Sequence, residues 1–350
     1  LHTLSQDSKY ILDFVLPNPA LNKSKSKSTK STKSTKSTKS TKSTKSSKKV
    51  APSKNKSLGL YKSSDIKYIA TAPIPWKTAN NINVVDGIVT GEILQVSNLA
   101  KVSSKYHKMM TDVLKLIRAR SGKIMIYHNN VHMSGVLFIK EILQHNGILD
   151  EYMPSVGSSI CSICGTRNDK HSNKKIKHGS TGHSFKPVRV VMIHSELDKN
   201  TTEKSINKFN RPSNSMGDDF MIILGSRKIR ESYDLKAIRH MLIMRRPDNI
   251  PMLIQIIGRS VRNNSHAALP DDMRHVNISI YTSGPSNKEL SYEERKYKEK
   301  MDDYVVIQQI ETIFHQNAVD AVINHEIIKP SLGSESLGDL RFTPTLAQKS

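Results

Sequence analysis

The sequence predicts an α/β fold in which helices cover both faces of a parallel sheet. Over the second half of the chain, short apolar runs of strand length alternate with stretches of helical period. Strands of a parallel sheet are buried on both faces, so they read as continuous apolar runs rather than as alternating ones. The predicted strands cover residues 123–128, 188–193, 220–224, 238–244 and 276–281.

The predicted helices fall between these runs. From about Ser104, apolar residues recur at helical spacing and form one stripe. This stripe consists of Tyr106, Met109, Met110, Val113 and Ile117. A second helix is expected over 134–145, with Gly147 as its C-terminal stop. A third helix is expected to begin near Asn200, where Glu203 completes a capping box.

A long charged helix is expected over 291–328. Its apolar residues are spaced as in an amphipathic helix, so one face is expected to pack onto the domain. The residues expected to reach the core are Tyr297, Met301, Tyr304, Ile310 and Phe314.

Positive charge is concentrated near the start of the chain. The 350 residues carry a formal net charge of +23, and residues 22–64 hold 14 lysines and no acidic residue. A Ser-Thr-Lys repeat runs from about Ser28 to Lys45, and this polar period buries nothing on a helix or strand. We therefore expect a disordered segment. A solvated linker or insertion is favoured over a salt-sensitive grip on nucleic-acid phosphates.

Composition also excludes several classes of protein. No apolar run reaches the roughly 18 residues that a membrane helix needs, and no signal peptide opens the chain. Its two cysteines are too few for a disulfide framework. These features predict a soluble intracellular protein.

The most specific chemistry lies in the segment Gln255-Ile-Ile-Gly258-Arg259-Ser-Val-Arg262. A helix over 252–262 would place Arg259 and Arg262 one turn apart on the face that also carries Gln255. Gly258 removes a side chain where a ligand or another backbone needs to come close. Two guanidinium groups and an amide on one face suit a polyanion such as the γ-phosphoryl of ATP. A solvated pair of arginines is the alternative, but apolar residues and a glycine fill the gaps between them.

This segment resembles motif VI of superfamily-2 helicases and translocases. Residues 122–128 resemble the strand of motif IV, and residues 224–236 lie where motif V is expected. The sequences of residues 246–249 and 259–270 are similar to those of a narrower group, the Swi/Snf-like ATPases of large cytoplasmic DNA viruses. This group includes the poxvirus-type early transcription factor and nucleoside triphosphatase proteins. The resemblance covers about residues 85–328.

The resemblance implies a RecA-like C-terminal lobe that donates arginine fingers, Arg259 and Arg262, to ATP bound with Mg²⁺ on a first lobe. Gln255 and Gly258 would belong to the same nucleotide site. Glu231 and Asp234 are candidates to orient the arginines or nearby waters, with an ordinary mixed-charge surface loop as the alternative.

Motif V in this family touches the nucleic-acid backbone. The resemblance therefore assigns nucleic-acid contacts to Ser226, which could donate to a phosphate, and to Arg227 and Lys228, which add positive charge.

The phosphate cradle of such enzymes is not found in this sequence. Residues 121–124 contain a Gly-Lys pair but lack the upstream glycine and the hydroxyl that would bind Mg²⁺. We expect the cradle and the metal-binding carboxylate in a preceding lobe, either cut off or on another polypeptide. The chain begins with Leu1 rather than Met, so we expect a fragment that does not hydrolyse ATP alone.

A second constellation predicts a metal site. Cys161 and Cys164 are followed by His178 and His183, close to the spacing of a two-cysteine, two-histidine zinc site. His171 is an alternative ligand in place of either histidine. Structural Zn²⁺ is favoured over catalytic Zn²⁺ because no acidic partner is in view, and a flexible basic insertion is the metal-free alternative.

These features together define the expected organisation. The segments are an inter-lobe or N-lobe remnant (1–21), the disordered segment (22–57), an inter-lobe region (58–100), the RecA-like lobe (101–284) with a zinc loop (157–185), a helical extension (285–330) and a tail (331–350).

The expected function is that of the C-terminal lobe of an ATP-dependent helicase or translocase acting in viral transcription. Its expected partners are DNA or RNA, an N-terminal helicase lobe and a viral RNA polymerase, in the virion or a cytoplasmic virus factory. The alternative is a non-catalytic nucleic-acid-binding or assembly subunit that uses a helicase-like lobe as a scaffold.

Overall fold

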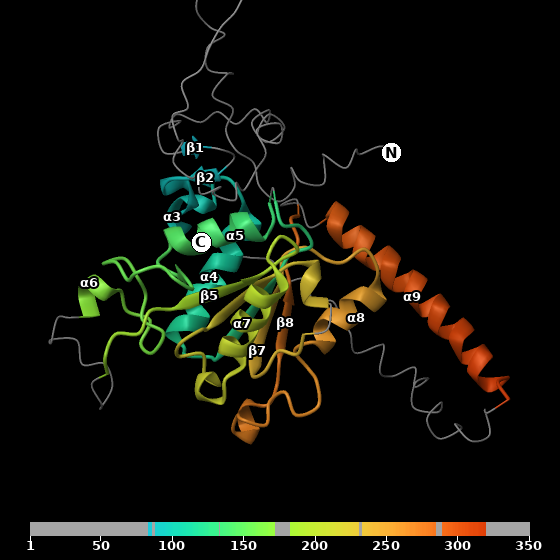
Figure 1. Cartoon of the computed structure of the whole chain (residues 1–350). Helices are drawn as coiled ribbons and strands as arrows, with labels where there is room; N and C mark the ends of the chain where they lie inside the picture. The colour runs from blue at the N-terminus through green and yellow to red at the C-terminus, as the bar shows by residue number, and fades with distance from the viewer. Residues whose placement is uncertain are drawn as a thin grey trace, which may run out of the picture. The chain divides into compact units, whose positions relative to one another are not determined.

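A computed structural model describes residues 83–85, 88–132, 134–171, 183–230, 233–284 and 289–319 (Figure 1). The segments predicted at 1–21, 22–57 and 331–350 lie outside the described residues. The chain divides into two compact units, one of residues 1–247 and 251–283, the other of residues 248–250 and 284–350.

The first unit is built on a six-stranded sheet. Its strand order is β4-β5-β6-β3-β7-β8, and every neighbouring pair is parallel. The strands are β3 (Lys123–Tyr127), β4 (Leu149–Asp150), β5 (Arg189–Ile193), β6 (Ile222–Gly225), β7 (Ile238–Ile243) and β8 (Asn277–Ile280). The predicted α/β fold with a parallel sheet is therefore confirmed.

Helices cover both faces of this sheet. On one face α4 (Ser104–Arg118) and α5 (Val136–His145) pack against the central strands, and the predicted apolar stripe of α4 is fully buried. The α7 helix (Lys199–Asn210) lies on the opposite side of the sheet and contacts β5 (Figure 1). Gly147 follows α5 with φ +87°, as the predicted C-terminal stop requires.

Short elements complete this unit. They are β1 (Asn83–Val85), β2 (Ile88–Thr90), η3 (Glu92–Leu94), α3 (Val96–Leu99), α6 (Asn168–His171), η4 (Pro212–Asn214), η5 (Arg227–Arg230), α8 (Ile250–Gly258) and η6 (Asp271–Met273).

Two details of this unit differ from the prediction. The α7 helix is capped by Asp198, whose carboxylate accepts from the Thr201 amide at 2.9 Å, so the capping box predicted from Asn200 and Glu203 is wrong. Asp198 wins because it is in extended backbone geometry, whereas Asn200 already lies inside the helix. The edge strand β8 is largely exposed rather than buried.

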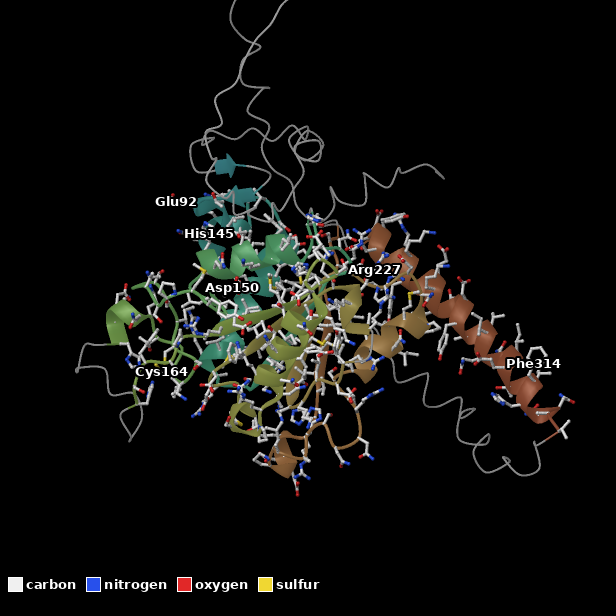
Figure 2. All side chains as sticks on the ribbon, viewed as in Figure 1. Glu92, His145, Asp150, Cys164, Arg227 and Phe314 are labelled. Atoms are coloured by element: carbon white, nitrogen blue, oxygen red, sulfur yellow. The ribbon has the colours of Figure 1, made fainter. Side chains whose placement is uncertain are left out.

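The second unit contains α9 (Tyr292–Gln316), which begins with a capping box between Ser291 and Glu294. No residue of this helix is buried within the described part of the chain; Ile310 is 48% and Phe314 72% exposed (Figure 2). The prediction of a core position is therefore wrong for Ile310 and Phe314, whereas Tyr297, Met301 and Tyr304 are half-buried. Helical spacing identifies an apolar face but not what covers it. None of the described helices is long and apolar enough to cross a membrane.

Lys123 is a charged residue in the middle of the first unit's core. Its Nζ donates to the carbonyl oxygens of Phe209 at 2.6 Å and Lys236 at 3.1 Å, and lies 4.2 Å from the centre of the Phe209 ring. Burial lowers the pKa of this ammonium group from 10.5 to about 7. Desolvation has this sign because it disfavours the charged form.

We expect Lys123→Met to remove a pH dependence of stability. Between the lowered pKa and the ordinary pKa of lysine, the unfolded chain binds a proton that the folded protein has lost. The free energy of unfolding should therefore rise with pH across this interval by about 1 kcal/mol per pH unit in the wild type. Denaturant unfolding of both proteins at several pH values measures the difference in slope, and equal slopes would contradict the lowered pKa.

Candidate functional site

Arg259 and Arg262 lie just beyond α8, not within it. The helix ends at Gly258, so the prediction of a helix through residue 262 is wrong for its last residues. The Arg259 amide bonds to the Ile256 carbonyl at 3.1 Å, which tightens the last turn, and the Arg259 carbonyl accepts from the Leu235 amide at 3.3 Å. This hydrogen bond joins the end of α8 to the segment before β7.

The two arginines still converge, because both reach the same carboxylate. Arg262 donates to Oδ1 of Asp234, and Nη1 of Arg259 lies 4.0 Å from the same oxygen. Arg259 also donates to the Arg230 carbonyl at 2.6 Å. Its side chain is 12% exposed, whereas those of Arg262 and Asp234 are 51% and 54% exposed. Arg259 is therefore held in place, and Arg262 is at the surface, where a partner or ligand can reach it.

Gln255 and Gly258 are on the last turns of α8. Gln255 is exposed. A Cβ placed on Gly258 would meet no heavy atom of the chain within 4 Å, so packing within the described structure does not require a glycine there. Gly258 therefore leaves open space beside the two arginines.

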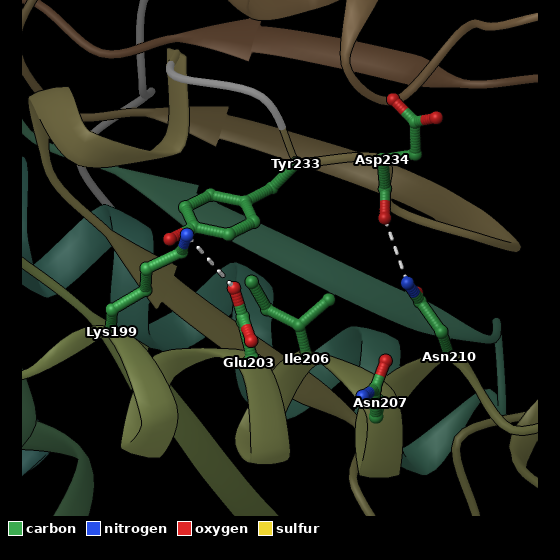
Figure 3. Close-up of a pocket in the computed structure, with 7 residues that line it drawn as sticks. All are labelled: Lys199, Glu203, Ile206, Asn207, Asn210, Tyr233 and Asp234. Atoms are coloured by element: carbon green, nitrogen blue, oxygen red, sulfur yellow. Dashed lines mark hydrogen bonds and ion pairs between the residues drawn. The ribbon is translucent and has the colours of Figure 1, made fainter.

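A pocket of about 620 Å³ lies next to Asp234 (Figure 3). The exposed side of α7 and the segment before β7 line it, and Lys199 and Glu203 form an ion pair of 3.8 Å along its wall. Asn210 donates to the Asp234 carbonyl at 2.7 Å and accepts from the Lys236 amide at 2.9 Å. Asn210 thus fixes the backbone that carries Asp234, and no sequence motif indicated it.

The residues predicted to bind nucleic acid lie in the turn that follows β6. Ser226 follows the carboxyl end of β6, and its amide bonds to the Ile193 carbonyl at 2.9 Å. Asp234 instead precedes the amino end of β7. Because the strands are parallel, Ser226 and Asp234 lie near opposite strand ends, and the bond from Arg259 to the Arg230 carbonyl at the end of η5 connects the two groups.

The environments of these three residues differ. Ser226 is 1% exposed, so its hydroxyl is buried in this conformation. Nζ of Lys228 donates to the Leu197 carbonyl at 2.5 Å and to Oγ1 of Thr202 at 3.1 Å, which ties it to the start of α7. Arg227 is exposed (Figure 2). Of the three, Arg227 has the most exposed side chain.

Gly225 precedes this turn at a position where a side chain would not fit. A Cβ at this position would lie 1.8 Å from Cδ1 of Ile229, the buried residue of η5. Gly225 therefore allows the chain to fold back tightly after β6. Glu231, the other predicted acidic residue, lies outside the described residues.

The predicted metal ligands are also partly brought together. Cys161, Cys164, His171 and His183 place one ligand atom each within 4.8 Å of one another. His178 lies outside the described residues. Burial is the main cause that raises the pKa of the Cys164 thiol above its ordinary value.

Comparison with known proteins identifies the family of the sheet domain. Residues 163–264 match the model of the helicase conserved C-terminal domain. The match spans β5, β6, β7 and α8 and includes Asp234 and both arginines. The chain contains a superfamily-2 helicase C-terminal domain.

Relatives of this chain include viral proteins. The chain is 35% identical to the early transcription factor large subunit homolog of African swine fever virus (strain Badajoz 1971 Vero-adapted), over 95% of this chain and 27% of that protein. It is 30% identical to the early transcription factor 70 kDa subunit of vaccinia virus (strain Ankara), over 58% of this chain and 27% of that one.

A third relative is described as a putative ATP-dependent RNA helicase L377 of Acanthamoeba polyphaga mimivirus, 26% identical over 68% of this chain and 22% of that protein. The chain thus spans about a quarter of the length of the curated relatives it matches.

Proposed function

We propose that this chain is the C-terminal lobe of a nucleic-acid-dependent ATPase of the superfamily-2 type. Arg259 and Arg262 would stabilise the charge that develops on the γ-phosphoryl of ATP bound with Mg²⁺ on a preceding lobe. The observation that carries the proposal is the convergence of both guanidinium groups on Asp234, with Arg262 half exposed and open space beside Gly258.

Asp234 has a defined role in this proposal. A carboxylate bonded to a guanidinium group neutralises and orients it while no phosphate is present. When the γ-phosphoryl arrives, Arg262 exchanges the carboxylate for phosphate oxygens, and Arg259 stays anchored on the Arg230 carbonyl. Gln255, exposed on the last turns of α8, and Glu231 would complete the same site.

Nucleic acid would contact the turn after β6, where Arg227 is exposed and Ser226 and Lys228 are less exposed. Closing of the two lobes on ATP would then move a strand of DNA or RNA, as in translocases of this family. The names of the relatives from African swine fever virus and vaccinia virus support a role in viral early transcription. A viral RNA polymerase is the partner that we propose for such a role.

The decisive experiment compares ATP hydrolysis by the chain alone with hydrolysis by the chain joined to the coding sequence that precedes it. We expect no activity from the chain alone and nucleic-acid-stimulated activity from the joined protein. If the chain joined to its preceding sequence folds but has no ATPase activity, the motor proposal is wrong.

A second candidate function is a scaffold that binds nucleic acid without catalysis, favoured by the 14 lysines of residues 22–64. Mobility-shift assays over a salt series, with and without residues 22–57, separate the two. Binding that disappears with the lysine segment indicates the scaffold, because counterion release by lysines makes affinity strongly salt-dependent.

We also propose that the loop between β4 and β5 binds structural Zn²⁺ through its two cysteines. This ion would not take part in ATP chemistry, since the described residues near the cysteines include no carboxylate among the clustered ligand atoms.

A further inference from the structure

The loop between β4 and β5 contains a tight turn that brings its two cysteines together. The Gly165 amide bonds to the Cys161 carbonyl at 2.9 Å, and the Cys161 amide bonds to the Thr166 carbonyl at 2.9 Å. Gly165 has φ +69°, a conformation that other residues adopt at a cost. This turn brings the two sulfur atoms within 4.8 Å of each other.

Two histidines approach this turn from different parts of the chain. His171 ends α6, which is held to the loop because the Asn168 amide bonds to the Ser159 carbonyl at 2.7 Å. The His171 ring packs edge-on against Phe185, with ring centres 5.3 Å apart. His183 lies shortly before β5. The two rings therefore reach the cysteines from a helix on one side and from the strand entry on the other.

Two distances within this cluster match those of a tetrahedral metal site. Nε2 of His171 lies 3.1 Å from Nε2 of His183, and Sγ of Cys161 lies 3.5 Å from the latter atom. Zn–N bonds near 2.05 Å and Zn–S bonds near 2.3 Å at tetrahedral angles place two nitrogens about 3.3 Å apart and a nitrogen and a sulfur about 3.6 Å apart. The observed separations agree with both values to within a few tenths of an ångström.

We infer that Cys161, Cys164, His171 and His183 bind one structural Zn²⁺ ion. This set replaces His178 of the sequence-based prediction with His171. A hydrogen bond between the two imidazoles would explain one distance, but it would not bring two sulfur atoms to the same point. The donor set selects the metal, because two thiolates and two imidazoles suit Zn²⁺, whereas Mg²⁺ and Ca²⁺ require oxygen ligands. Four protein ligands leave no position for substrate, so the site is structural.

The ion would fix the entry into β5. Cys161 pairs with Pro187 in an antiparallel bridge, the Ser162 amide bonds to the Lys186 carbonyl at 2.7 Å, and the Val188 amide bonds to the Ile160 carbonyl at 2.8 Å. The metal-binding turn is thus joined directly to the residues before the strand. A long insertion in the crossover between two parallel strands is in this way clamped at its base.

The test measures zinc in the purified 350-residue chain by elemental analysis after exhaustive dialysis. We expect one zinc ion per chain, lost in Cys161→Ser, Cys164→Ser and His171→Asn. His178→Asn is the matched control, because it makes the same chemical change at the histidine that sequence spacing alone selects, and it should keep its zinc. Circular dichroism of each variant reports whether it folds.

Substitution of Co²⁺ into the wild-type chain tests the ligands without any variant. Tetrahedral cobalt with two thiolates gives intense visible bands and a thiolate-to-metal charge-transfer band in the near ultraviolet. A wild-type chain without bound metal at neutral pH would overturn the site, and loss of zinc in His178→Asn but not in His171→Asn would overturn the ligand set. Neither readout depends on ATP hydrolysis, so the outcome is separate from that of the proposed motor function.

Discussion

Arg262→Ala should abolish almost all ATP hydrolysis by the complete enzyme. An arginine finger acts on charge that appears only in the transition state, and its loss lowers kcat by about 10³–10⁵-fold in enzymes that transfer phosphoryl groups. The substitution should change the free energy of unfolding little, because the ion pair between Arg262 and Asp234 is exposed. Exposed ion pairs contribute about 0–1 kcal/mol to stability. Arg259→Ala should have a similar effect on kcat.

Steady-state kinetics on the lobe-joined protein measure this effect as a loss in kcat that exceeds any change in KM for ATP. Arg274→Ala is the matched control, because Arg274 also forms an exposed ion pair, with Asp271 at 2.6 Å. Its activity should stay within a few-fold of the wild type. Near-normal kcat in Arg262→Ala would remove the role assigned to this arginine.

Phe138→Ala should cost about 3–5 kcal/mol of the free energy of unfolding. Phe138 is fully buried on α5, and its ring packs edge-on against Tyr106 of α4 with centres 5.7 Å apart. Truncation leaves a cavity between two helices and the sheet, and the Tyr106 ring loses its aromatic partner.

Denaturant unfolding of the chain followed by circular dichroism measures this cost. The chain provides its own control, because Phe314 on α9 is 72% exposed, and Phe314→Ala should change the free energy of unfolding by no more than about 0.5 kcal/mol. A loss at Phe314 as large as that at Phe138 would mean that α9 is covered in solution.

The sheet could be predicted because burial on both faces forces continuous apolar runs. Every residue of β3, β6 and β7 is buried, and each strand lies within a predicted run or within one residue of it. The apolar stripe of α4 could be predicted for a similar reason, since a helix with one buried face must repeat its apolar residues at helical spacing.

What the sequence could not predict depends on where distant segments meet. The bond from Arg259 to the Arg230 carbonyl and the contact of Asn210 with the backbone of Asp234 join residues 24 to 29 positions apart, through backbone atoms that every residue carries. The choice between His171 and His178 depends in the same way on the path of a loop. Spacing admits either histidine, and only α6 brings the first of them to the cysteines.

The strand order has a consequence for synthesis of the protein. Ile124 of β3 pairs with Ile222 on one side and with His240 on the other, so the strand made first at the centre of the sheet waits for partners about a hundred residues later. During translation β3 emerges with both edges unpaired, and pairings between such distant segments form slowly. A chain whose synthesis stops before residue 222 would expose the apolar strand β3 without β6 or β7 to pair with it. Such a chain is a natural substrate for chaperones.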